Sequence, residues 1–238
     1  MLSLLLLVAA TYVAAAISGA AGFGGALLLL PLLVGTVGSV HAVPLLTITQ
    51  FIGNISRACF GFSRIQWRSV GLFLVTAVPL SALGAFSFIG LSKVVVTRCV
   101  GSVLLMAVGL KYYGLLELKG GPFLLIAGGG VVGFLSGLVG SAGPLGAAVF
   151  LTLNLDPVAY VASEAITALV MHGVKMSVYQ HYVPMPQHLW LLAGFMSLAM
   201  ILGTWSSKRL IEKLPREKFQ KYVAYLLVFI GIYMVLHG

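Results

Sequence analysis

Six polar or ionisable side chains stand out because they lie inside long apolar stretches of the 238-residue chain. They are Gln50, Asn54, Arg57, Glu164, His172 and Lys175. At about 100° of rotation per residue, the first three share one face of a helix, and so do the last three. Each face holds one basic residue, and ionisable groups in such surroundings are costly enough to indicate function. We therefore predict that these two faces bind a small anion.

Each ionisable residue also has a simpler interpretation. Arg57 and Lys175 lie close enough to their expected helix ends for either head group to reach lipid headgroups. Glu164 either pairs with Lys175, carries a proton or lies at the membrane interface. His172 either carries a proton or forms a hydrogen bond within the protein. Glu164 and His172 are thus the two candidates for proton coupling.

Composition places these residues in a membrane. The chain is 60% hydrophobic and only 8% charged, with a mean hydropathy of +1.09, whereas soluble domains carry about 25% charged residues. So few charges could not cover a soluble surface, which excludes soluble enzymes, nucleic-acid-binding proteins and disordered chains. Cys59 and Cys99 provide neither a disulfide framework nor a metal-binding spacing. In a membrane protein the net charge of +9 has two parts. Basic residues in loops set the topology, and basic residues within the membrane are candidates for function.

An internal repeat relates the two halves of the chain at an offset of 118 residues. The clearest matches are Ser18/Ser136, Gly19/Gly137, Gly22/Gly140 and Gly25/Gly143. The same offset pairs Asn54 with His172 and Arg57 with Lys175. We therefore predict two membrane repeats, residues 1–119 and 120–238, within one transport domain.

Each repeat begins with an apolar stretch that is interrupted by glycines, at 2–38 and 122–154. Three helices are expected after each stretch. Their ranges are about 41–62, 68–90 and 93–116, then 158–180, 188–207 and 218–237. The second stretch is too long for one membrane helix of about 20 residues and too short for two. We therefore expect two half-helices that meet at the glycines.

Basic residues in the loops indicate how the repeats are oriented. Residues 207–221 hold six of them and are expected to form a cytoplasmic loop. If both glycine-interrupted stretches are re-entrant hairpins, ten basic residues lie on the cytoplasmic side and two on the outer side. If each stretch instead crosses the membrane once, eight basic residues lie on the cytoplasmic side and four on the outer side. The predicted fold is therefore an all-α polytopic membrane protein with two inverted repeats and both termini outside. Each repeat is a glycine-broken re-entrant hairpin followed by three transmembrane helices.

Glycines at the two breaks are further candidate substrate-binding residues. They are Gly22, Gly24, Gly25, Gly140 and Gly143. A half-helix that begins just after such glycines presents free N–H groups and the positive end of its dipole to an anion. Pro144, which follows Gly143, suits a first helical residue. Glycines also serve as close-packing surfaces between membrane helices, and that alternative stays open.

Two glycine motifs extend this pattern. They are Gly19-x-x-Gly22-x-Gly24-Gly25 with Pro31 six residues on, and Gly133-x-x-Ser136-Gly137-x-x-Gly140-x-x-Gly143-Pro144. With Arg64-Ile65-Gln66-Trp67-Arg68, Gly203 and Gly231, the chain resembles the sulfite exporter TauE/SafE family over nearly its whole length. The chain departs from the family pattern at Ala26 and Ala142, two positions at which the family often has glycine. The resemblance implies a bacterial inner-membrane exporter of small anions, chiefly sulfite or organosulfur compounds such as sulfoacetate.

These features together predict a secondary transporter that exports a small oxyanion, sulfite or a related organosulfur anion, by alternating access at a midplane site. A passive anion channel and a transporter of an unrelated small anion are the alternatives. We expect no enzyme activity, because no Ser/His/Asp set, His-Glu-x-x-His motif or paired carboxylates are present. No cofactor, metal or nucleic-acid partner is expected. The partners are the anion and the lipid bilayer, with proton coupling open, in the bacterial cell inner membrane.

Overall fold

The computed structural model describes residues 2–87, 94, 98, 101–102, 105, 120–139, 142–179 and 185–237. In these ranges the chain forms helices joined by turns and contains no strand. The elements are α1 (Leu2–Ala21), α2 (Gly25–Phe60), the 3-10 helix η1 (Phe62–Arg64), α3 (Trp67–Phe86), α5 (Pro122–Val139), α6 (Gly143–Leu151), α7 (Pro157–Tyr179), α8 (Gln187–Glu212) and α9 (Arg216–His237). Five of the six helices predicted after the glycine stretches are therefore confirmed within a few residues, and the one at 93–116 lies largely outside the described residues.

Both glycine-interrupted stretches are broken where the glycines cluster. In the first, α1 and α2 are separated at Gly22 and Gly24, whose φ angles of 88° and 98° lie in the left-handed region that favours glycine. The long helix α2 is interrupted again at Gly38, where φ is 80°. In the second stretch α5 ends at Val139 and α6 begins at Gly143, with residues 140–141 outside the described part. Each stretch is thus divided into two helices at a glycine cluster, as predicted, but α1 with 20 residues and α5 with 18 are longer than the expected half-helices.

The predicted cytoplasmic loop at 207–221 is wrong in its extent. Helix α8 continues to Glu212 and α9 already begins at Arg216, so only three residues connect them. Lys208 stabilises the last turns of α8 through two contacts. Its Nζ lies 3.8 Å from Glu212 Oε1, one turn later, and 4.6 Å from the Trp205 ring centroid. Lysine and arginine are good helix formers, and their long side chains can reach water from a helix. Their charges therefore gather at one end of this helix pair without a long loop.

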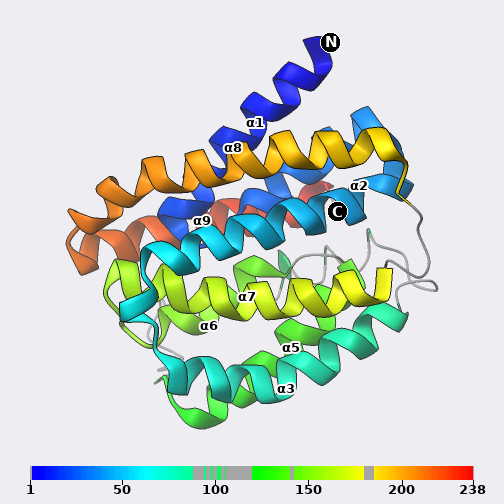
Figure 1. Cartoon of the computed structure of the whole chain (residues 1–238). Helices are drawn as coiled ribbons and strands as arrows, with labels where there is room; N and C mark the ends of the chain where they lie inside the picture. Colours follow the sequence, from blue (N-terminus) through cyan, green and yellow to red (C-terminus); the bar gives the residue numbers. More distant parts are fainter. Residues whose placement is uncertain are drawn as a thin grey trace.

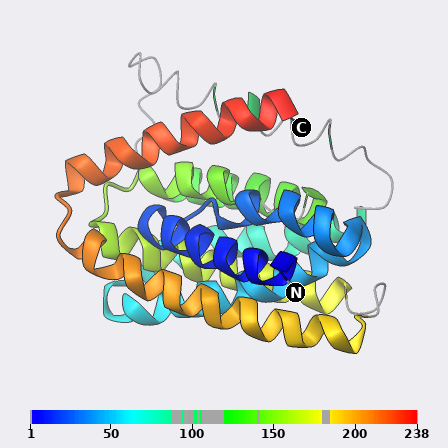
Figure 2. The ribbon, with the colours of Figure 1, turned by 90° about the horizontal axis from the view of Figure 1, so that it is seen from above.

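Helices α2 and α7 lie in the middle of the molecule (Figure 1). Helix α8 packs against α1 and α2 on one side, while α3 packs against α5 and α7 on the other. Viewed from above, α1 lies between α8, which runs along one side of the molecule, and α9, which runs along the other (Figure 2). The central position of α2 and α7 matters because these helices carry all six polar residues singled out in the sequence.

Some glycines serve close packing, as the alternative interpretation proposed. A Cβ on Gly133 of α5 would lie 2.7 Å from the Cα of Ala77, and Gly129 and Gly137 likewise face the α3 backbone. These three glycines are spaced four residues apart, so they form one flat stripe along α5. The packing glycines of α5 are thus distinct from Gly22 and Gly24, whose backbone conformation breaks the helix.

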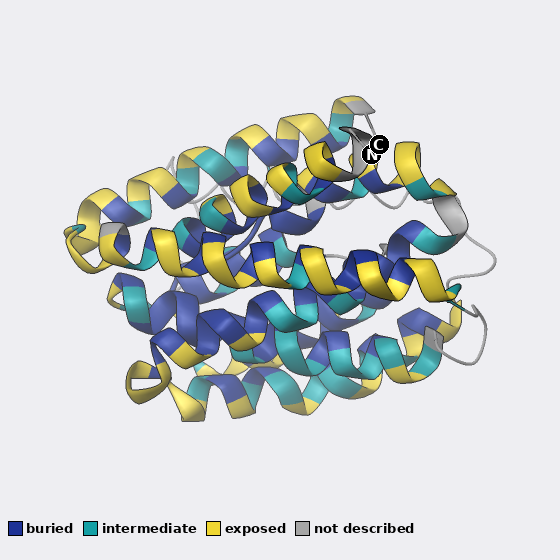
Figure 3. Ribbon diagram, turned by 45° about the horizontal axis from the view of Figure 1, so that its top comes forward, coloured by how far each residue is buried: buried dark blue, intermediate teal, exposed yellow. Residues whose placement is uncertain are grey.

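The outer surface is suited to lipid. Within the described residues, four helices are long and apolar enough to cross a membrane, at Trp67–Phe86, Pro157–Val178, Gln187–Arg209 and Arg216–Leu236. Large apolar side chains such as Leu191, Phe195 and Leu198 of α8 are exposed, and exposed residues lie on the outer faces of the bundle (Figure 3). Helix α7, in contrast, is mostly buried. A soluble protein rarely exposes so large an apolar surface. The chain is therefore a multi-pass membrane protein.

Candidate functional site

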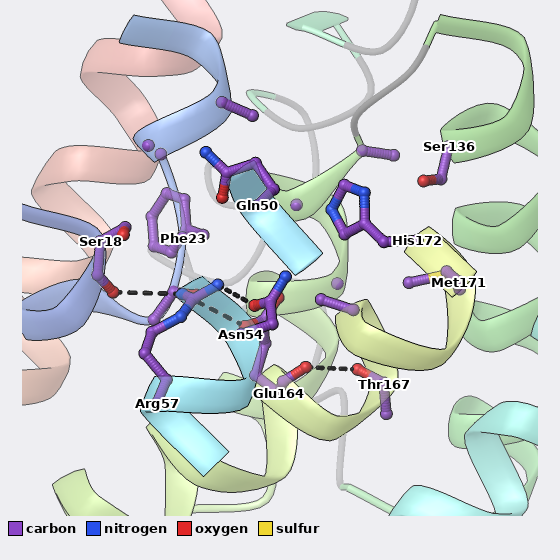
Figure 4. A pocket seen from close by; sticks show the side chains of 18 of the residues that line it. Ser18, Phe23, Gln50, Asn54, Arg57, Ser136, Glu164, Thr167, Met171 and His172 are labelled. Atoms are coloured by element: carbon purple, nitrogen blue, oxygen red, sulfur yellow. Dashed lines mark hydrogen bonds and ion pairs between the residues drawn. The ribbon is translucent and has the colours of Figure 1, made fainter. Parts of the chain in front are cut away.

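A cavity lies where the two helix breaks meet the polar faces of α2 and α7 (Figure 4). Its wall is formed by Ser18, Gly22, Phe23, Gly24, Gly25, Ala26, Gln50, Asn54, Arg57, Val132, Ser136, Ala142, Gly143, Gly146, Glu164, Thr167, Ala168, Met171 and His172. The cavity volume is about 30 Å³, and a single water needs about 10–15 Å³ by this measure. The cavity therefore suits a very small polar ligand, and both halves of the chain build it.

Most of the predicted site residues meet at this cavity. Those that line it are Gly22, Gly24, Gly25, Gln50, Asn54, Arg57, Gly143, Glu164 and His172. Gly140 lies outside the described residues. Lys175 is not part of the wall, although its neighbour in space Ser136 is. Helix periodicity placed the first-half residues on one face correctly, because α2 is regular between Gln50 and Arg57.

Arg57 is anchored at the end of α1. Its guanidinium donates hydrogen bonds to the carbonyl oxygens of Ser18, at 3.2 Å, and Gly22, and to the Asn54 side-chain oxygen. The carbonyl groups at a helix C-terminus carry partial negative charge, so a cation is favourable there. The residue as a whole is only 3% exposed, and its side chain therefore does not extend to the lipid headgroups.

Lys175 makes the corresponding contact in the second half. Its Nζ donates to Ser136 Oγ at 3.1 Å, and the residue is fully buried. Both cation–serine pairs span 39 residues, and both members are related by the offset of 118. Lys175 therefore does not extend to the surface either, and the two basic residues occupy matching places in the two halves.

Glu164 pairs with Arg57 instead of Lys175. The Arg57 Nη1 and Glu164 Oε2 atoms are 3.7 Å apart, and both side chains are 4% exposed. Of the three roles that the sequence left open for Glu164, pairing with a cation is observed, with Arg57 as the partner in place of Lys175. An acid of α7 therefore faces the cation of α2, and the ion pair joins the two halves across the cavity.

Several hydrogen-bond donors in the cavity wall have no partner among the described residues. They are Gln50 Nε2, Asn54 Nδ2 and Arg57 Nε, with His172 Nδ1 able to donate in one of its tautomers. The Gln50 and His172 side chains lie toward one end of the cavity and Arg57 and Glu164 toward the other (Figure 4). Buried polar groups almost always have partners. Such a concentration of unused donors therefore indicates a ligand that accepts hydrogen bonds.

The helix starts add to these donors. Neither α2 nor α6 has a side-chain cap at its N-terminus, and both begin in the cavity wall. A Cβ on Gly25 would lie 3.2 Å from Gln50 Nε2 and 3.1 Å from Ser18 Oγ, so glycine leaves room for both polar groups. The first N–H groups of a helix have no intrahelical acceptor and attract anions. The geometry of the first break thus fits the prediction that its glycines help to bind a substrate anion.

Tyr160 was missed in the sequence because it looks like an ordinary core residue. Its ring lies against Gly22, where an added Cβ would be 2.8 Å from Tyr160 Cε1. Its hydroxyl donates to the carbonyl oxygen of Ala147 in α6 at 3.2 Å. Tyr160 therefore links the first break to the helix that follows the second break. Ser18 and Ser136 were also missed as wall residues, although their match in the repeat was a visible signal.

Comparison with known proteins assigns the chain to a family. The family model described as sulfite exporter TauE/SafE matches residues 7–234. No curated protein and no solved structure matches the chain. Since the family model covers nearly the whole chain, the protein belongs to the sulfite exporter TauE/SafE family of membrane transport proteins.

Proposed function

We propose that this protein is a secondary transporter that exports a small oxyanion, sulfite or a related organosulfur anion, across the bacterial inner membrane. The observation that carries the proposal is the set of buried, unpartnered donors on Gln50, Asn54 and Arg57 around a small cavity. An oxyanion has several acceptor oxygens in a small volume, so it can satisfy these donors together. The family supports an anion transporter as the class of protein.

The same cavity suits alternating access. Its wall combines the break of the first half, the helix start of the second half, and faces of α2 and α7. In transporters built from inverted repeats, rocking of one repeat against the other exposes such a site to each side in turn. We propose that the two glycine-interrupted stretches are re-entrant hairpins in inverted repeats, with both termini outside. The loop charges support that orientation.

Sulfite flux in proteoliposomes tests the proposal. The wild-type chain should exchange labelled sulfite across the vesicle membrane, and an imposed membrane potential should drive net sulfite movement against its concentration gradient. A passive anion channel would give flux without acceleration by sulfite on the opposite side. If the protein moved another small anion but not sulfite, the anion site would stand and the proposed substrate would be wrong.

A matched pair of variants tests the donor set. Gln50→Leu removes the unpartnered amide at nearly constant volume, and Gln187→Leu makes the same change at an exposed position at the start of α8. One hydrogen bond contributes about 0.5–1.5 kcal/mol, so sulfite affinity should fall about 2- to 10-fold in Gln50→Leu. Gln187→Leu should bind and transport like the wild type. Equal affinity in both variants would remove Gln50 from the site.

A further inference from the structure

Glu164 differs from every other described carboxylate in its burial. It is 3% exposed and lines the cavity. The other described carboxylates are all exposed, and they are Asp156, Glu212 and Glu217. A negative charge in the wall of an anion site opposes the anion, so the presence of Glu164 there requires an explanation.

The pairing of Glu164 with Arg57 is loose. Their charged atoms are 3.7 Å apart, and Glu164 Oε2 accepts no hydrogen bond from the described residues. The hydrogen bonds of the Arg57 guanidinium go instead to Ser18, Gly22 and Asn54. The carboxylate can therefore separate from Arg57 without disturbing the contacts that hold Arg57 in place.

Few other ionisable groups surround Glu164. Arg57 on α2 and Tyr160 on α7 interact with it electrostatically, while His172 and Lys175 lie further along α7. Helices α5 and α6 have no ionisable side chain, and α1 has only the exposed Tyr12. The remaining charged or histidine side chains on α2, η1, α3 and α8 are all exposed or half-buried. They are His41, which lies about four turns before Arg57, and Arg64, Arg68, His188, Lys208, Arg209 and Glu212. Arg57 is thus the single cation close to Glu164 in the described cavity wall.

We infer that Glu164 carries a proton together with the transported anion, an inference that rests on the proposed function. In the empty cavity the ionised carboxylate balances Arg57. When an anion binds beside Arg57, two negative charges would face one cation, so a proton from the water on the open side binds to the Glu164 carboxylate. When the anion leaves on the opposite side of the membrane, Glu164 releases this proton to that side as well and pairs with Arg57 again.

This coupling fits outward transport of a divalent anion. A dianion that moves with one proton transfers one net negative charge, and an interior-negative membrane potential drives that charge outward. A monovalent anion that moves with one proton transfers no net charge. The charge state of the substrate therefore decides whether the membrane potential contributes to export.

Calorimetry on the purified full-length chain tests the inference directly. Sulfite is titrated at alkaline pH in two buffers of different ionisation enthalpy, which together report the number of protons taken up on binding. We expect about one proton per sulfite in the wild type and none in Glu164→Gln. Glu217→Gln, the same change at an exposed position, should behave like the wild type. Equal proton uptake in wild type and Glu164→Gln would overturn the inference.

A second measurement needs no variant and covers the case in which Glu164→Gln fails to fold. The infrared difference spectrum of the wild type with and without sulfite should gain the carbonyl band of a protonated carboxyl group. Binding of sulfite without this band would overturn the inference and leave the proposed function intact. If the wild type fails to bind sulfite at all, the proposed function fails first, and the inference fails with it.

Discussion

Arg57 and Lys175 occupy equivalent positions in the two halves, yet the structure uses them differently. Each is buried, and each contacts a serine 39 residues earlier, near the helix break of its own half. Arg57 lines the cavity and faces Glu164, whereas Lys175 is absent from the cavity wall. The comparison teaches that the repeat conserves an anchoring contact, while the charged site is built by one half's cation with the other half's acid.

The asymmetry follows from what stands at the matching positions. At an offset of 118 residues, Glu164 corresponds to the buried Leu46, and Gln50 corresponds to Ala168. The first half therefore contributes the cation and the Gln50 amide, and the second half contributes the acid and His172. One cavity with complementary walls results, instead of two copies of the same site.

The largest expected effect concerns the Arg57–Glu164 ion pair. Arg57→Met should lower the free energy of unfolding by about 3–5 kcal/mol, because it leaves a buried carboxylate without its cation. Adding Glu164→Gln should restore the part of that loss that comes from the unpaired carboxylate, whereas the part that comes from the lost Arg57 hydrogen bonds should stay. Thermal and denaturant unfolding of the two single variants and the double variant measure this coupling. Additive losses in the double variant would show that the two side chains do not interact.

Anion affinity should separate the two basic residues. A hydrogen bond to a charged group contributes about 1.5–3 kcal/mol, so loss of the Arg57 guanidinium should weaken sulfite binding about 10- to 100-fold. Lys175→Met should change sulfite affinity less than about 3-fold, because Lys175 is not in the wall. Titration of sulfite against folded, membrane-inserted Arg57→Met and Lys175→Met gives both values. Equal losses in the two variants would contradict the assigned asymmetry.

Glycines of the two halves should respond differently to a single added methyl group. Gly22→Ala places a side chain in the left-handed region and against the Tyr160 ring, so it should destabilise the fold by about 1–2 kcal/mol or more. Gly146→Ala meets only ordinary contacts, at 3.5 Å from Val132 Cγ1, so it should fold normally and weaken sulfite binding by narrowing the cavity. Thermal unfolding and sulfite titration distinguish the two effects, and normal stability in Gly22→Ala would contradict the first.

The smallest expected effect concerns the link between the two breaks. Tyr160→Phe removes the hydrogen bond to the Ala147 carbonyl oxygen and keeps the ring on Gly22. Stability should fall by about 0.5–1.5 kcal/mol, and sulfite affinity should stay unchanged because Tyr160 does not line the cavity. Unfolding and binding measurements on this variant check both statements. A large affinity loss with unchanged stability would make Tyr160 a binding residue.

Local patterns explain why much of the site could be predicted. Gln50, Asn54 and Arg57 share a helix face through spacing alone, and the glycine clusters mark helix breaks because only glycine readily adopts the φ angles seen at Gly22 and Gly24. The extent of the 207–221 loop was mispredicted because charge density indicates solvent exposure and does not distinguish a loop from a helix end. Tyr160 was missed because its contacts depend on helices far apart in the sequence.

The sequence by itself determined that this is a helical membrane protein of the TauE/SafE family, with two broken helix pairs and two repeat-related cations within apolar stretches. These properties depend on composition, on helical spacing and on residue types, all of which are local along the chain. Only the tertiary structure decided that Glu164 meets Arg57, and that Lys175 contacts Ser136 outside the cavity wall. The physical reason is that charge pairing depends on distances of a few ångströms between α2 and α7, which only their packing sets.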